Sequence, residues 1–239
     1  MPWNAGKRSQ QATKNTIMGK LYLVRHGQAS LGADDYDQLS ALGARQAQRL
    51  GEHWQAQGLN FDAVITGTLK RHQQTFEGIQ RGLGTTHNPS QWPSLNEYDS
   101  EAIIRCVHAG PLGKPTTPEG YRDHFRLLRQ GLKAWMMGQT KPLGMPSHAE
   151  FSDGITRALD HVRQQHEGNV MLVSSGGPIS VAVGQVLKLE ADSVIELNLR
   201  IRNSAVCELS FNPKRFSLVS FNTISHLETA SHQDWITYA

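Results

Sequence analysis

The chain has 239 residues and a formal net charge of +3, from 24 lysines and arginines against 21 acidic side chains. This balance argues against a protein that binds nucleic acid through the phosphate backbone, because such proteins carry a clear excess of basic side chains. No stretch approaches the ~18 consecutive apolar residues of a membrane-spanning helix, and two cysteines, Cys106 and Cys207, are too few for a disulfide scaffold or a cysteine-rich zinc site.

The chain begins with a polar, basic stretch, residues 1–19, and its first acidic residue is Asp34. We expect a solvated tail there, although the same composition also fits a transit peptide. The folded domain is then expected to span residues 20–239. It opens with a short apolar strand, residues 21–24, which ends in the polar cluster Arg-His-Gly-Gln at residues 25–28.

A helix, a strand and a second helix are expected next. Ser40 is a good N-cap for a helix that runs to about Gln57. Residues 62–66 have the composition of a second strand. A helix from about residue 68 to residue 81 follows it, with Gly82 and Gly84 as the predicted stop.

Residues 85–147 are expected to be largely irregular, because most of the prolines of the chain fall there. A helix is expected only around residues 121–137. Such a stretch within an alternating α/β pattern is typical of an insertion. We therefore predict a cap at about residues 98–147, over one edge of the sheet.

The remaining chain returns to the α/β pattern. A capping-box sequence at residues 147–150 (Ser-His-Ala-Glu) starts a helix that stops at Gly168. A third strand at residues 169–173 is followed by Ser-Ser-Gly-Gly, and Pro178 suits the first turn of a helix to about Leu189. Residues 206–211 and 216–221 are predicted to form a hairpin. This alternation predicts a three-layer α/β/α sandwich with a mostly parallel sheet.

Polar groups at the ends of the predicted strands indicate a ligand site, because ligands of parallel sheets bind beyond the carboxyl ends of the strands. The first strand delivers Arg25 and His26. A neutral imidazole can take up a phosphoryl group covalently while a guanidinium binds its oxygens; a purely structural histidine is the alternative. Arg71 opens the helix after the second strand, which we expect to lie next to the first strand, so two arginines would share one phosphate pocket.

Four segments together resemble the histidine phosphatase superfamily, which has the phosphoglycerate mutase-like fold. They are Arg-His-Gly at residues 25–27, Leu-Ser-x-x-Gly-x-x-Gln-Ala at 39–47, Thr-Gly-Thr-Leu-Lys-Arg-His-Gln-Gln-Thr at 66–75 and Leu-Asn-Glu at 95–97. The resemblance covers about residues 20–225. It implies that His26 becomes phosphorylated and that Arg25 and Arg71 bind the phosphoryl oxygens. It also implies that Glu97 acts as the general acid and then as the base, with Asp99 and Glu101 as rival candidates for that role.

The third strand departs from the family pattern. The family usually has Ser-His-Gly there, and this chain has Ser175 at the position of the histidine. Loss of one transition-state hydrogen-bond donor typically costs ~3–4 kcal/mol. The chain is then a slow phosphatase, or an enzyme whose pocket is rebuilt with His72 and the N–H groups at Gly176, or a module that binds phosphorylated ligands without turnover.

A mutase is the nearest alternative within the same chemistry. Phosphoglycerate mutases follow the acidic residue with Arg-x-Tyr-Gly, however, whereas residues 98–100 here are Tyr-Asp-Ser. We therefore expect a histidine acid/alkaline-type phosphatase, a phosphoric monoester hydrolase that needs neither cofactor nor metal. Its partner is expected to be a small phosphorylated substrate or a phosphoprotein, with no nucleic acid and no membrane involved, in the cytoplasm. The sequence specifies neither the substrate nor the oligomeric state.

Overall fold

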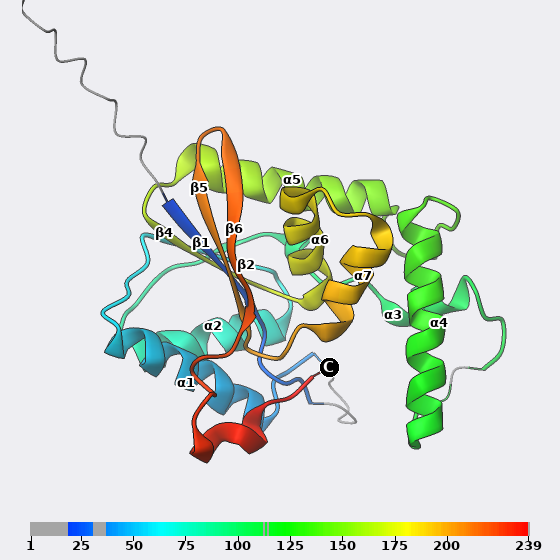
Figure 1. Cartoon of the computed structure of the whole chain (residues 1–239), viewed down its shortest axis with the longest axis horizontal. Coiled ribbons are helices and arrows are strands. Elements are labelled where there is room, and N and C mark those ends of the chain that lie inside the picture. The colour runs from blue at the N-terminus through cyan, green and yellow to red at the C-terminus, as the bar shows by residue number, and fades with distance from the viewer. Residues whose placement is uncertain (1–18, 31–36, 112, 114, 239) are drawn as a thin grey trace, which may run out of the picture.

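The computed structural model describes residues 19–30, 37–111, 113 and 115–238 (Figure 1). The predicted tail therefore lies outside the described residues except for Gly19, which begins the first strand. The strands are β1 (Gly19–Arg25), β2 (Ala63–Thr66), β3 (Ser90–Gln91), β4 (Asn169–Ser174), β5 (Val206–Asn212) and β6 (Arg215–Thr223). The helices are α1 (Ala41–Ala56), α2 (Lys70–Leu83), α3 (Ser100–Arg105), α4 (Pro118–Met136), α5 (His148–Gln165), α6 (Gly176–Leu187) and α7 (Ala191–Arg200), with two short 3₁₀ helices, η1 (Pro93–Leu95) and η2 (Ala230–Trp235).

The strands form one mixed sheet in the order β3-β2-β4-β1-β5-β6. Strands β3, β2, β4 and β1 are parallel to one another, and the hairpin β5–β6 adds to β1 in the antiparallel direction. The expectation that the second strand lies next to the first was wrong, because β4 lies between them. Parallel strands end at the same edge, however, so the segments that follow β1, β4 and β2 still meet there.

Helices cover both faces of the sheet, which confirms the predicted three-layer α/β fold. Strand β1 shows how the sequence achieves this, because its side chains alternate between the faces. Leu21 and Leu23 join the apolar cluster that contains residues of α5 and α6, whereas Tyr22 and Val24 join the cluster formed with α1 and α2. All four side chains are buried, so the nucleophile candidate follows a strand that is fixed on both sides.

The close contact between α1 and α2 corrects one predicted helix end. Helix α2 begins at Lys70 and runs to Leu83, and only Gly84, with a left-handed φ of 68°, ends it. Gly82 lies inside the helix instead of stopping it. A Cβ there would collide with the backbone carbonyl of Gln48 in α1, so this glycine permits the two helices to pack closely.

Several caps follow the sequence predictions. The hydroxyl of Ser40 accepts the N–H of Gly43 at 3.0 Å, and the capping box of α5 forms between Ser147 and Glu150. Helix α4 begins earlier than expected, because Thr117 caps it and Pro118 occupies its first turn. The hairpin of β5 and β6 is confirmed.

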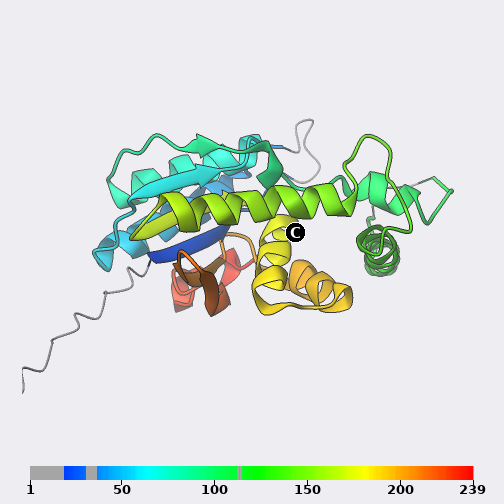
Figure 2. The same ribbon diagram turned by 90° about the horizontal axis from the view of Figure 1, so that it is seen from above.

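Two α-helices and one strand were not predicted. Residues 85–147 contain the short edge strand β3 and helix α3, whose N-cap is Asp99, and α7 follows α6 directly. Figure 1 and Figure 2 both place α4 at one end of the molecule, where the ion pair between Lys133 and Asp192 joins it to α7. Among the residues described, no helix combines the length and apolar character needed to cross a membrane.

Candidate active site

The backbone of His26 is held on both sides directly after β1. Its N–H donates to the carbonyl of Ser174 at 2.9 Å, and its carbonyl accepts the N–H of Ser204 at 3.1 Å. Ser204 adopts a left-handed φ of 56°, which is uncommon for a residue with a side chain. The backbone from which the imidazole projects is therefore fixed by β4 and by the segment that precedes β5.

The ring of His26 has a defined tautomer. Its Nδ1 lies 2.7 Å from the carbonyl oxygen of Gly27, and because a carbonyl oxygen only accepts, Nδ1 must carry the hydrogen. The lone pair is then on Nε2. Burial, followed by the positive charges of Arg25 and Arg71, holds the pKa of this ring well below its usual range. The imidazole is therefore neutral at neutral pH, which is the nucleophilic form.

Two buried arginines come from different elements, and their charges act on the same two side chains, His26 and Glu97. Arg25 ends β1 and donates from Nη1 to the carbonyl of Ile201 at 2.5 Å. Arg71 is the second residue of α2 and donates from Nη1 to Oδ1 of Asp37 at 2.6 Å. Both positive charges lower the pKa of His26 and oppose the rise in the pKa of Glu97. The four side chains therefore share one electrostatic environment, which would favour a phosphoryl group.

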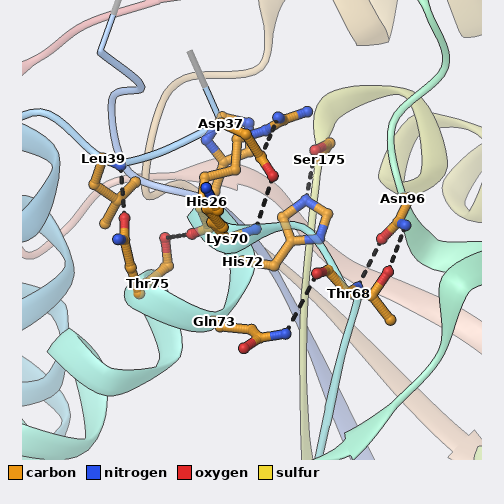
Figure 3. A network of polar contacts seen from close by, with 12 residues as sticks. His26, Asp37, Leu39, Thr68, Lys70, His72, Gln73, Thr75, Asn96 and Ser175 are labelled. Carbon is orange, nitrogen blue, oxygen red and sulfur yellow. Dashed lines mark hydrogen bonds and ion pairs between the residues drawn. The ribbon is translucent and has the colours of Figure 1, made fainter. Parts of the chain in front are cut away.

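A buried imidazole–hydroxyl pair lies beside His26. His72, from the first turn of α2, has its Nε2 2.7 Å from the Oγ of Ser175, which follows β4 (Figure 3). The ring centroids of His26 and His72 are 5.8 Å apart. Burial, and then the charge of Arg71, lowers the pKa of His72 to about 3. This imidazole is therefore also neutral, and it contacts the residue that follows β4.

Glu97 is placed by its neighbour Asn96. The side chain of Asn96 accepts the N–H of Thr68 at 2.7 Å and donates to the Thr68 hydroxyl at 2.6 Å, so it ties this loop to the segment before α2 (Figure 3). Oε2 of Glu97 then accepts the N–H of Gly177 in the first turn of α6 at 3.2 Å. Burial raises the pKa of this carboxyl, so it holds a proton to higher pH than an exposed glutamate does.

The two rival acids are engaged elsewhere. Asp99 accepts the N–H groups of Glu101 and Ala102 as the N-cap of α3, at 2.9 and 3.1 Å. Glu101 forms an exposed ion pair with Arg105 on the same helix. The carboxylate that reaches the amino end of α6 is that of Glu97. Gly176, which opens α6, lies in the same turn, where helix N–H groups favour an anion.

Sequence reasoning missed three residues that shape this site. They are Asp37, which binds Arg71, Asn96, which fixes the loop of Glu97, and Ser204, which holds the backbone of His26. Asn96 had a weak signal, because it lies within the Leu-Asn-Glu segment. Asp37 and Ser204 act through contacts between distant segments, and no local sequence pattern predicts such contacts. In the described part of the chain, no group of three or more His, Cys, Asp or Glu side chains is arranged to hold a metal ion.

Acid is expected to destabilise the fold as the pH falls from 6.5 towards 3, because His72 and His226 are buried and have pKa values of about 3. In this range the two histidines are protonated in the unfolded chain but stay neutral in the folded chain, so the free energy of unfolding decreases with falling pH. Each group contributes at most about 1.4 kcal/mol per pH unit. Urea denaturation across this range measures the slope, and a stability that stays flat contradicts the buried neutral state of the two rings.

Comparisons with known proteins place the chain in a family. The model of the histidine phosphatase superfamily (branch 1) matches residues 21–224. A probable phosphoglycerate mutase of Cronobacter sakazakii is 29% identical over 201 residues, which cover 81% of this chain and 86% of the relative. The mitochondrial serine/threonine-protein phosphatase Pgam5 of Drosophila melanogaster is 23% identical over 200 residues; the match covers 81% of this chain but only 58% of that protein.

Solved structures show the same fold. The phosphoserine phosphatase of Entamoeba histolytica, in complex with 3-phosphoglyceric acid, superposes with a TM-score of 0.62. Its sequence is 21% identical, and the match covers 87% of this chain and 99% of that structure. At this level of identity the likeness concerns the arrangement of strands and helices.

Proposed function

This chain belongs to branch 1 of the histidine phosphatase superfamily, whose members named above are phosphatases or mutases, and we propose that it hydrolyses phosphomonoesters through a phosphohistidine on His26. One observation carries the proposal. The Nδ1–H of His26 is held by the carbonyl of Gly27, so the lone pair lies on Nε2 of a neutral ring whose pKa is lowered by burial and by the charges of Arg25 and Arg71. A neutral imidazole beside two guanidinium groups suits attack on a phosphoryl group.

In the first step, Nε2 of His26 attacks phosphorus and the bond from phosphorus to the ester oxygen breaks. Arg25 and Arg71 bind the phosphoryl oxygens and stabilise their charge. Glu97 donates its proton to the departing oxygen, so that an alcohol leaves. The raised pKa of Glu97 supports this role, and the negative charge of a bound phosphoryl group raises that pKa further.

In the second step, water attacks the phosphohistidine. The Glu97 carboxylate accepts a proton from this water, the nitrogen–phosphorus bond breaks, and inorganic phosphate leaves. Glu97 is thereby protonated again and His26 is again neutral. One carboxyl group thus serves both steps, which is consistent with its position at the amino end of α6, beside the pocket.

Ser175 occupies the position of the usual second histidine in our proposal, and His72 supplies the missing imidazole from α2. Nδ1 of His72 has no hydrogen-bond partner among the described residues. A buried N–H without an acceptor is rarer than a buried lone pair, so the hydrogen belongs on Nε2, which donates to Ser175. The Ser175 hydroxyl can then donate its own hydrogen to a phosphoryl oxygen. Gly176 would add a helix N–H to the same oxygens.

Replacement of His72 by alanine is expected to lower kcat by about a hundred- to a thousandfold, because the Ser175 hydroxyl loses the donor that orients it and its transition-state contact is lost with that orientation. The double variant His72→Ala with Ser175→His moves the imidazole to the end of β4 and is expected to regain most of this loss. Steady-state kinetics with one phosphomonoester compares the three proteins. A single variant as active as the wild type, or a double variant no better than the single one, contradicts the proposed role of His72.

Two other outcomes for the same pocket have specific support. Similarity to a probable phosphoglycerate mutase favours phosphoryl transfer to a second hydroxyl, and Ser175 favours a module that binds phosphorylated ligands without turnover. Assays with phosphoserine, 3-phosphoglycerate and a phosphopeptide separate them. Release of inorganic phosphate without an acceptor supports the hydrolase, isomerised phosphate ester indicates a mutase, and tight binding with neither product indicates the binding module.

The leaving group is proposed to contact residues 98–147, as a cap that selects a small phosphorylated substrate or a phosphoprotein. Tyr98 supports this position, because it follows Glu97 directly and its hydroxyl accepts the side-chain N–H of Asn198 at 2.7 Å. The start of this segment is therefore held against α7, beside the general acid.

A further inference from the structure

We infer that Asp37 positions Arg71 for phosphoryl binding, and this inference rests on the proposed function. The carboxylate of Asp37 makes two contacts with one helix end. Oδ1 accepts from Nη1 of Arg71 at 2.6 Å, and Oδ2 accepts the backbone N–H of Lys70 at 3.0 Å (Figure 3). Both contacts lie in the first turn of α2, so Asp37 fixes the arginine and the backbone from which it projects.

Helix α2 needs this carboxylate because its own N-cap provides none. The N-cap position is occupied by Leu69, which has no side-chain hydrogen bond to the helix. The first N–H groups of an α-helix have no partner within the helix, and the helix dipole favours a carboxylate at that end. Asp37 therefore takes the place of the cap from a distant segment.

The segment that carries Asp37 is itself anchored to both sides of the site. The N–H of Leu39 donates to the side chain of Gln74 in α2 at 2.8 Å. Ser40 donates from its N–H and from its hydroxyl to Gln28, at 2.9 and 2.8 Å, in the loop that follows His26. Asp37 thus links the orientation of Arg71 to the loop of the nucleophile.

The ion pair leaves Arg71 suited to bind a phosphoryl group as well. A guanidinium has five N–H donors in a rigid fork, and the ion pair with Asp37 is made through Nη1. The Arg71 side chain is 9% exposed and that of Asp37 is 31% exposed. The charge of Asp37 is balanced by Arg71 and by the helix end, and it is partly screened by solvent, which limits its repulsion of a phosphoryl dianion. Its orienting effect is therefore expected to dominate.

The test is a double-mutant cycle of inorganic phosphate binding, measured by calorimetry. Asp37→Asn keeps an acceptor for the N–H of Lys70 and removes the charge that holds Arg71, and we expect phosphate binding to weaken about tenfold. In an Arg71→Met background the same change is expected to alter binding by no more than about twofold, because there is no guanidinium left to orient. Equal effects in both backgrounds, or tighter binding by Asp37→Asn, overturn the inference.

Two further variants keep the test decisive. Arg71→Lys retains the charge without the fork, so it replaces the methionine variant if that protein does not fold. Asp160→Asn removes the carboxylate of another aspartate–arginine pair, with Arg163 on α5 at 2.8 Å, and is expected to leave phosphate binding unchanged; a matching loss in this control overturns the inference.

Turnover separates this inference from the proposed function. A wild type that binds phosphate, shows the coupling between Asp37 and Arg71 and releases no phosphate from any monoester supports the inference and refutes the phosphatase. A wild type that hydrolyses monoesters without this coupling supports the phosphatase and refutes the inference. In an active protein, Asp37→Asn is expected to lower kcat/KM about tenfold while the thermal midpoint stays near that of Asp160→Asn.

Discussion

Replacement of His26 by alanine is expected to lower kcat by on the order of 10⁴-fold or more, because no other side chain in the pocket replaces the nucleophile. His72 is a neutral imidazole at a ring-centroid distance of 5.8 Å, but its Nε2 is engaged with Ser175. We therefore expect no substitute nucleophile to take over. The assay is phosphate release under saturating substrate, compared with the wild type.

Two measurements separate lost chemistry from a damaged pocket in this variant. Arg25 and Arg71 remain in place, so the alanine variant should still bind inorganic phosphate, as calorimetry can show. His161→Ala removes a ring that packs against Trp92 and His166, contacts outside the site described above, and is expected to keep full activity. An alanine variant at position 26 that retains a substantial fraction of the wild-type rate rejects the proposed nucleophile.

Replacement of Glu97 by glutamine has the second-largest expected effect. With an alkyl phosphate, kcat should fall by about a hundred- to ten-thousandfold, because the departing alkoxide receives no proton. With p-nitrophenyl phosphate the leaving group needs little protonation, so the first step should stay fast. The second step still lacks its base, and a burst of nitrophenol with accumulated phosphoenzyme is therefore expected in rapid-quench experiments.

The pH profile gives a second reading of Glu97. The first step needs its protonated form, and burial raises its pKa. In the wild type, activity with an alkyl phosphate should therefore fall as the pH rises through this raised pKa, and the fall should be absent in Glu97→Gln. Equal losses with both substrates in the rate of phosphoenzyme formation, or an unchanged alkaline limb in the variant, would assign the general acid to another group.

The parts of the site that were predictable lie within continuous motifs. Arg25 and His26 lie at the end of an apolar strand, and Arg71 and His72 lie at the start of the helix after the second strand. Local periodicity and the predicted ends of these elements therefore locate all four residues. The resemblance to a known family placed Glu97, since a loop glutamate has no distinguishing periodicity of its own. The layers of the fold could likewise be predicted, because strand and helix patterns alternate along the chain.

The parts that were not predictable depend on contacts between distant segments. Strand order is one example, because the apolar pattern of β4 does not state that it lies between β1 and β2. Asp37 is another, since its role arises only when its loop meets the start of α2. Gly82 resembled a helix stop and instead marks a close helix–helix contact. Local propensity yields to such tertiary constraints.

The proposed mechanism requires a phosphoryl group bound covalently to His26, and this phosphoenzyme can be trapped. The wild-type protein is incubated with a radiolabelled phosphomonoester, quenched in base and digested, and the labelled peptide is identified by mass spectrometry. We expect label that is stable in base, lost in acid and located on the peptide that contains His26. Phosphate release without any such label, or acid-stable label located on Ser175, would contradict the mechanism.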